Sequence, residues 1–299
     1  MSDRLDWERE GRDWPNRDAS RFVVAGGLRW HVQVMGQGPL VLMVHGTGAS
    51  THSWRDFAPL LARHFTIVAP DLPGHGFTQA PASGRLSLPG MAQSLQHLLN
   101  EMQLRPTFAI GHSAGAAIAI RMCQDGLMQP LGLVSLNGAL LPYGGSIAEF
   151  LSPVAKMLAA NPFVPRFFAW QAREPATLDR LLRNTGSKID ARGAELYGRL
   201  IRNPGHVAAA LAMMAGWDLA GLKRELPRVK VPVLLVAGGQ DRMIPADQAF
   251  AVRKLLQNAK MAYLRQHGHL AHEQAPDEIA ALVVQFFGDV QMSAQRCVA

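Results

Sequence analysis

Residues 109–116 read AIGHSAGA and place a serine between two glycines. The short apolar run PTFAI at 106–110 precedes this stretch, and the alanine-rich run AAIAIRMC at 116–123 follows it. A short apolar run that ends at a glycine is typical of a buried strand, and the second run is typical of a helix packed against a sheet. Ser113 is therefore predicted to stand at a sharp strand-to-helix turn, where a G-x-S-x-G motif has chemical meaning.

Short apolar runs recur on both sides of this turn, and helical patterns at 53–65, 88–104 and 245–257 lie between them. Several runs are apolar on both faces, as parallel strands covered by helices on both sides should be. Strands that alternate with helices predict an α/β fold with a mostly parallel sheet, whose ligands bind beyond the carboxyl ends of the strands. The predicted strands cover 22–26, 28–36, 39–46, 65–72, 106–112, 130–138, 231–239 and 260–268.

The interval from about Leu140 to Trp217 breaks this alternation, because it contains helical segments and no convincing strand. Its aromatic and methionine side chains are expected mainly to pack a cap onto the core, and a few of them to line an apolar pocket between the two layers. The polar segment with Trp7 and Trp14 is expected either to lie along the core or to engage a partner. The predicted division is an N-terminal arm at 1–20, a core at 21–139 and 218–288, an inserted helical cap at 140–217 and a tail at 289–299.

The bulk composition is that of an ordinary globular protein, with 48% hydrophobic and 18% charged residues in a chain of 299. Two cysteines, Cys123 and Cys297, cannot build a disulfide framework and lack the spacing of zinc ligands. The charged start MSDRLDWERE has no apolar signal-peptide segment, so a cytoplasmic protein is expected. The formal charge of +7 comes mostly from scattered arginines. Because these arginines are scattered and not clustered with aromatic side chains, no nucleic-acid partner is predicted. The positive charge is compatible with anionic ligands or peripheral membrane association.

An acid and a histidine follow Ser113 at the ends of later predicted strands. VPVLLVAGGQD at 231–241 places Asp241 just after an apolar run, and MAYLRQHGHLAHEQAP at 261–276 places His269 just after the next one. A serine hydroxyl is a poor nucleophile until a base removes its proton. His269 would take that proton and return it to the leaving group, while Asp241 would fix the histidine tautomer and stabilise the imidazolium.

Neighbouring residues compete for two of these roles. His267 and His272 flank His269, which we favour because it directly follows the turn glycine. Asn137 is a rival of Asp241 because it also ends a predicted strand, but it carries no charge that could stabilise an imidazolium.

The loop HGTGAS at 45–50 follows another apolar strand and is the expected partner of the nucleophile turn. The backbone N–H groups of Thr47 and Ala114 are predicted to stabilise an oxyanion, and His45 is expected to shape this loop. Losing one such donor typically costs about 10²–10³ in turnover. No metal or organic cofactor is needed for this chemistry.

Three further polar residues are interpreted as structural. Asp71 and His75 lie in a Gly/Pro-rich turn, and Asp247 follows Pro245 at a predicted helix start, where an N-cap would explain it.

Five motifs in this order resemble the α/β-hydrolase superfamily, and the resemblance covers roughly residues 20–288. It implies an α/β-hydrolase fold with an inserted cap and the activity of a serine hydrolase. Serine at position 113 argues against haloalkane dehalogenases and epoxide hydrolases, which this superfamily builds with an aspartate nucleophile. The motifs are His45-Gly46-Thr47-Gly48, Asp71-Leu72-Pro73-Gly74-His75-Gly76, Gly111-His112-Ser113-Ala114-Gly115, Gly239-Gln240-Asp241, and Gly268-His269 with Glu273 and Pro276.

Three segments, at 13–39, 45–56 and 69–78, give a narrower resemblance to the magnesium-chelatase accessory proteins of bacteriochlorophyll biosynthesis. The chain is more distantly similar to pheophytinase-type hydrolases. This resemblance implies a tetrapyrrole substrate or ligand and a contact with magnesium chelatase. An arginine-rimmed apolar slot would suit tetrapyrrole propionates, although solvated helix faces explain the same arginines.

Three functions follow from these resemblances and from the predicted triad. The first is an ester hydrolase that acts on a tetrapyrrole. The second is a non-catalytic porphyrin-binding accessory protein, since one fold hosts many functions. The third is a general carboxylesterase or C–C bond hydrolase.

Overall fold

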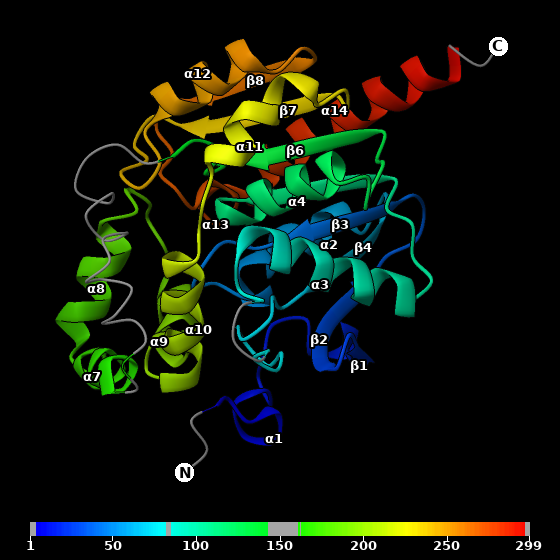
Figure 1. The fold of residues 1–299 in the computed structure, drawn as a ribbon. Coiled ribbons are helices and arrows are strands. Elements are labelled where there is room, and N and C mark those ends of the chain that lie inside the picture. Colours follow the sequence, from blue (N-terminus) through cyan, green and yellow to red (C-terminus); the bar gives the residue numbers. More distant parts are fainter. Residues whose placement is uncertain (1–3, 82–84, 143–160, 162, 297–299) are drawn as a thin grey trace.

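The computed structural model describes residues 4–81, 85–142, 161 and 163–296. Within them, eight strands form one sheet in the order β1-β2-β4-β3-β5-β6-β7-β8 (Figure 1). β2 pairs antiparallel with β1 and β4, and every other pair is parallel. The predicted α/β class with a mostly parallel sheet is therefore confirmed. The strands are Ser20–Ala25 (β1), Leu28–Met35 (β2), Leu40–Val44 (β3), Thr66–Pro70 (β4), Phe108–His112 (β5), Gly132–Leu136 (β6), Val233–Gly238 (β7) and Ala259–Leu264 (β8).

Helices flank the sheet and also occur in the described part of the interval between β6 and β7. They are Trp7–Glu10 (α1), Phe57–Leu61 (α2), Leu88–Glu101 (α3), Ala114–Gln124 (α4), Phe163–Gln171 (α7), Pro175–Arg183 (α8), Ala191–Ile201 (α9), Pro204–Ala215 (α10), Ala220–Glu225 (α11), Ala246–Leu255 (α12), Ala271–Gln274 (α13) and Pro276–Arg296 (α14). Short 3₁₀ turns occur at Arg17–Ala19, Thr51–Trp54 and Leu226–Arg228.

The core has two layers because successive strand residues point to opposite faces of the sheet. Leu42 and Val44 of β3 pack into a cluster with α3 and α4. Val41 and Met43 of the same strand pack into a second cluster with α2 and α14. Burial on both faces explains why the central strands read as continuous apolar runs.

Two helix predictions are wrong in detail. The helix predicted over 53–65 is a 3₁₀ turn at Thr51–Trp54 followed by the short α2. Pro59 lies in the first turn of α2, and its missing N–H and bulky ring prevent the helix from starting much earlier. Asp247 is not an N-cap, because Pro245 holds that position and Asp247 lies inside the first turn of α12. There its negative charge interacts favourably with the positive, N-terminal end of the helix dipole.

Helices α7 to α10 form a separate layer beside the sheet (Figure 1). They occupy part of the interval predicted as a cap, of which residues 143–160 and 162 lie outside the described residues. The cap boundaries at 140 and 217 stay a prediction. No helix in the described ranges is both long and apolar enough to cross a membrane.

The described residues of the N-terminal arm lie along the core, which is one of the two alternatives left by the sequence, and a partner for the arm stays a prediction. Trp14 is only 2% exposed, and its Nε1–H donates to Thr51 Oγ1 at 3.0 Å. Its ring packs edge-on against Phe77 and shares a buried cluster with Leu196 and Leu200 of α9. The arm therefore packs between the core and one cap helix.

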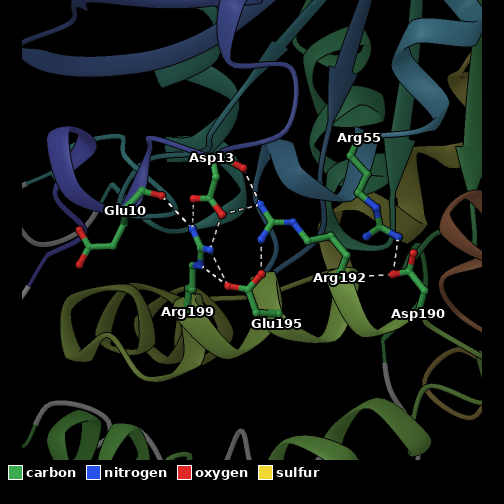
Figure 2. Close-up of polar contacts among 8 residues, drawn as sticks. Glu10, Asp13, Arg55, Asp190, Arg192, Glu195 and Arg199 are labelled. Carbon is green, nitrogen blue, oxygen red and sulfur yellow. Dashed lines mark hydrogen bonds and ion pairs between the residues drawn. The ribbon is translucent and has the colours of Figure 1, made fainter.

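Ion pairs reinforce this contact between the arm and α9 (Figure 2). Arg199 donates to Asp13 Oδ1 and Oδ2, both at 2.6 Å, and Arg192 donates to Asp13 Oδ2 at 2.9 Å. These guanidinium groups, Arg199 first, lower the pKa of Asp13. At the start of α9, Arg55 Nη2 from the core donates to Asp190 Oδ1 at 2.8 Å. Helix α9 is thus attached to the core at several points.

Candidate active site

Ser113 stands between β5 and α4 in a strained backbone conformation, with φ +52° and ψ −118°. Non-glycine residues rarely adopt a positive φ, and such strain is concentrated at functional sites. The flanking glycines are needed because the turn is tight. A Cβ on Gly111 would lie 2.4 Å from Ala116 Cα, and one on Gly115 would lie 2.0 Å from the Val44 carbonyl oxygen. Steric crowding on both sides of the serine therefore explains the G-x-S-x-G pattern.

Asp241 and His269 meet in the loops that follow β7 and β8. The Nδ1–H of His269 donates to Asp241 Oδ2 at 2.8 Å, and both residues are buried. The other carboxylate oxygen, Oδ1, accepts from the backbone N–H groups of Met243 and Ile244, each at 2.8 Å. A carboxylate held in this way fixes the imidazole tautomer whose Nε2 can act as a base.

Asn137 also belongs to this site. The sequence suggested it only as an alternative to Asp241. It follows β6 with a φ of +47°, and its Nδ2 donates to Asp241 Oδ2 at 2.8 Å and to the Gly268 carbonyl at 3.2 Å. The amide therefore supports the acid and the histidine loop together. Its position after a strand was visible in the sequence, but its pairing with Asp241 depends on the alignment of β6 beside β7.

Ser113 lies beside the histidine loop. The ring of the adjacent His112 is 4.8 Å from that of His269, centroid to centroid, and His112 Nε2–H donates to the His269 carbonyl at 2.9 Å. Among the described residues, no hydrogen bond joins Ser113 Oγ to the His269 ring. In unliganded enzymes such bonds are often long and tighten only with substrate. The contact between nucleophile and base stays a prediction.

The two predicted oxyanion donors flank the nucleophile turn. Ala114 is the first residue of α4, where an N–H has no intrahelical acceptor. Thr47 lies in the loop after β3, and a Cβ on its neighbour Gly46 would come within 3.0 Å of Ser113 Cβ. Neither N–H bonds to another described residue. Unpaired amides next to the nucleophile are what an oxyanion site requires, and their role stays a prediction.

The competing histidines lie elsewhere. His267 Nε2 pairs with Glu278 Oε2 at 3.0 Å near the surface. His272 is fully buried, with its Nε2 3.9 Å from Glu273 Oε1. Of the three histidines in this loop, the structure pairs His269 with Asp241.

Asp71 has a structural role, as its turn context indicated. Its Oδ1 accepts from Thr51 N at 2.7 Å, and its Oδ2 accepts from Phe77 N at 2.9 Å and from His31 Nδ1 at 2.8 Å. Burial raises the pKa of this carboxyl, but His31 and these hydrogen bonds outweigh burial and hold the pKa below its usual range. His45 bonds to the Gly46 carbonyl through Nδ1 at 2.8 Å, within the loop after β3.

Helix α10 forms hydrogen bonds with the loop after β3. His206 Nε2–H donates to the Gly48 carbonyl at 3.0 Å, and its Nδ1 accepts from Gly76 N at 3.1 Å. Two helical turns further on, Met213 Sδ accepts a hydrogen bond from Thr47 Oγ1 at 3.5 Å. Burial lowers the pKa of His206 to about 4, so this imidazole is neutral at physiological pH. Part of the helical layer is therefore bonded directly to the candidate site.

The segment after α8 forms a second connection that the sequence did not indicate. Thr185 O accepts from His269 N at 2.9 Å, and Ser187 Oγ accepts from Leu270 N at 2.8 Å. Gly186, at a φ of +73°, passes so close that a Cβ would lie 1.8 Å from the Gln240 carbonyl oxygen. Glycine is therefore required where this segment crosses the loop after β7 that holds Asp241.

Comparison with known proteins agrees with this architecture. The sequence model described as "Alpha/beta hydrolase family" matches residues 41–282. The magnesium-chelatase 30 kDa subunit of Rhodobacter capsulatus is 38% identical over 282 residues, which cover 92% of this chain and 96% of that protein. The pimeloyl-[acyl-carrier protein] methyl ester esterase of Methylococcus capsulatus is 29% identical over 75% of this chain and 85% of that protein. An alpha/beta hydrolase fold protein from Burkholderia ambifaria has a TM-score of 0.77 and 24% identity over 90% of this chain and 98% of that chain.

The matched range contains Ser113, Asp241 and His269. The superfamily resemblance and the narrower resemblance to a magnesium-chelatase protein are both confirmed. This chain belongs to the alpha/beta hydrolase family and is a homologue of a magnesium-chelatase subunit.

Proposed function

We propose that this protein is a serine hydrolase that cleaves an ester by acyl transfer. The observation that carries the proposal is the buried Asp241–His269 pair, joined at 2.8 Å, beside the strained turn that holds Ser113. Burial and paired hydrogen bonds preorganise an acid–histidine pair of the kind that activates a serine hydroxyl.

In the proposed mechanism, Ser113 Oγ attacks the ester carbonyl carbon while His269 Nε2 takes the hydroxyl proton. The N–H groups of Thr47 and Ala114 stabilise the oxyanion as the carbonyl π bond opens. His269 then gives the proton to the departing alcohol, and an acyl-serine remains. A water molecule, deprotonated by His269, releases the acid and restores Ser113. Asp241 stays ionised throughout and stabilises the imidazolium.

The proposed substrate is a carboxylic ester of a tetrapyrrole, and the proposed partner is magnesium chelatase. The 38% identity to a magnesium-chelatase subunit supports both, because it extends over nearly the whole of each chain. An ester-cleaving relative at 29% identity supports the reaction type.

A non-catalytic porphyrin-binding role is the second candidate. It is favoured by one observation, that no described hydrogen bond joins Ser113 Oγ to the His269 ring. The name of the chelatase relative is equally compatible with a protein that delivers a porphyrin.

Protoporphyrin dimethyl ester and a set of p-nitrophenyl esters would distinguish these functions. A tetrapyrrole esterase releases methanol from the porphyrin ester, and Ser113→Ala abolishes this release while leaving porphyrin affinity intact. Porphyrin binding without release by the wild-type protein would support the second candidate. Cleavage of p-nitrophenyl esters without porphyrin binding would keep the hydrolase and reject its tetrapyrrole substrate.

A further inference from the structure

Helix α7 presents aromatic side chains to solvent. Its residues read FVPRFFAWQ, and it buries Pro165 and Ala169 while contacting α10. Phe163, Phe167 and Trp170 follow at helical spacing on another face and are 70%, 55% and 62% exposed. Phe168 is also exposed, and the ring centroids of Phe167 and Trp170 are 6.0 Å apart. Large aromatic side chains exposed together on one helix mark an interaction site.

The charge around this face is positive. Over the described residues 163–183, which include α7 and α8, four basic residues oppose two acidic ones, and all six are exposed. Leu181 of α8 adds an apolar side chain that is 47% exposed. The charged residues are Arg166, Arg173, Glu174, Asp179, Arg180 and Arg183. We call the exposed aromatics of α7 together with Arg173, Arg180 and Arg183 the α7–α8 surface.

We infer that the α7–α8 surface docks on a bilayer that contains anionic lipid. Helices that lie in the plane of a membrane interface bury Trp, Phe and Leu to the depth of the headgroups and present Arg or Lys to anionic lipid. The surface has both components, and the net formal charge of +7 adds long-range attraction. A second copy of the chain fits less well, because two such surfaces would bring like charges together.

The position of the surface gives this docking a consequence for the site. Figure 1 places α7 and α8 at the outer side of the helical layer, and α10 contacts α7. Through His206 and Met213, α10 also bonds to the loops of the candidate site. Docking would bring an apolar substrate dissolved in the bilayer to the layer that covers the site. The inference itself stands without hydrolysis, since it concerns lipid binding alone.

Co-sedimentation with vesicles tests the inference. We expect the full-length protein to bind vesicles of phosphatidylcholine with 30 mol% phosphatidylglycerol, and to bind pure phosphatidylcholine at least about tenfold less, because the arginines would lose their attraction to anionic headgroups. Phe167→Ser with Trp170→Ser should weaken binding by at least about tenfold through lost apolar burial. The matched control is Phe250→Ser on α12, a phenylalanine that is 48% exposed on a distant element and should leave binding unchanged.

Two further readouts make the outcome decisive. Brominated lipid should quench the fluorescence of the wild-type protein more than that of Trp170→Phe, because the bilayer would receive that indole. Sedimentation velocity should show the same oligomeric state for the wild-type protein and the double variant. The inference would be overturned if the wild-type protein did not bind vesicles or if the double variant bound them equally well. It would also be overturned if the wild-type protein were a dimer and the double variant a monomer. None of these results depends on the activity of Ser113, so failure here and failure of the proposed hydrolase are distinguishable.

Discussion

Helices α9 and α7 belong to the same layer but differ in how they contact the rest of the molecule. Helix α9 is tied to the N-terminal arm through Arg192 and Arg199. It is tied to the core through Asp190 at its N-cap, and its Tyr197 donates to the buried Glu273 Oε1 at 2.7 Å. Helix α7 contacts α10 and turns four aromatic side chains to solvent. One helix holds the layer in place, and the other is exposed at its outer side. Fixed and accessible helices therefore lie within the same helical layer.

The largest expected effect is the difference in stability between substitutions of two tryptophans, one buried and one exposed. Replacement of Trp14 by alanine should lower the free energy of unfolding by about 3–5 kcal/mol, because this side chain of the arm is buried against α9. The exposed Trp170 on α7 should change stability by less than about 0.5 kcal/mol under the same substitution. Urea denaturation of both variants measures the contrast. Equal destabilisation would mean that α7 is anchored as firmly as α9.

The next effect concerns pH and the contact between α9 and α13. Burial raises the pKa of Glu273 to about 8, while hydrogen bonding by Tyr197 and the charge of Arg55 oppose the rise. Between its ordinary pKa of 4.5 and about 8, the folded protein binds the extra proton, so stability is lost as pH rises through this window. The slope is at most about 1.4 kcal/mol per pH unit.

Glu273→Gln keeps an acceptor for Tyr197 and removes the titration. The difference in melting temperature between this variant and the wild-type protein should therefore grow in favour of the variant from pH 5 to pH 8. Glu101→Gln, at an exposed carboxylate at the end of α3, is the matched control and should show no such trend. Parallel pH profiles for Glu273→Gln and the wild-type protein would contradict the account.

The smallest effect belongs to the ion pairs of the arm. Asp13→Ala should cost about 0.2–1 kcal/mol, because the Asp13 side chain is 53% exposed and solvent screens its pairs with the arginines of α9. Added salt should reduce this cost further. Asp18→Ala on the same arm is the control. A loss as large as that of Trp14→Ala would mean that charge, and not packing, holds the arm.

Much of the fold and the site could be predicted because their signals are local. Apolar runs bounded by turn residues predicted each strand, and the order of Ser113, Asp241 and His269 along the chain suggested a shared edge of the sheet. Two of these residues are in contact in the structure. Asp241 and His269 each follow a parallel strand, and the carboxyl ends of such strands lie at one edge.

The rest could not be predicted because it depends on contacts between distant segments. Asn137 pairs with a carboxylate 104 residues away, and no local pattern announces that contact. Thr185 and Ser187 hold the histidine loop from a segment whose sequence reads only as a helix end. The packing of Trp14 against Phe77 and α9 also joins segments far apart in the chain. Periodicity predicts elements, whereas supporting contacts require the assembled fold.

The central claim, that Ser113 is an activated nucleophile, is tested most directly by intact mass after treatment with a fluorophosphonate. We predict one adduct per wild-type chain, no adduct on Ser113→Ala, and labelling of His269→Ala slowed by at least about 10³-fold. Unchanged melting temperatures would show that both variants are folded. A folded wild-type protein that takes no adduct, or a Ser113→Ala variant that is labelled as fast as wild type, would contradict the account.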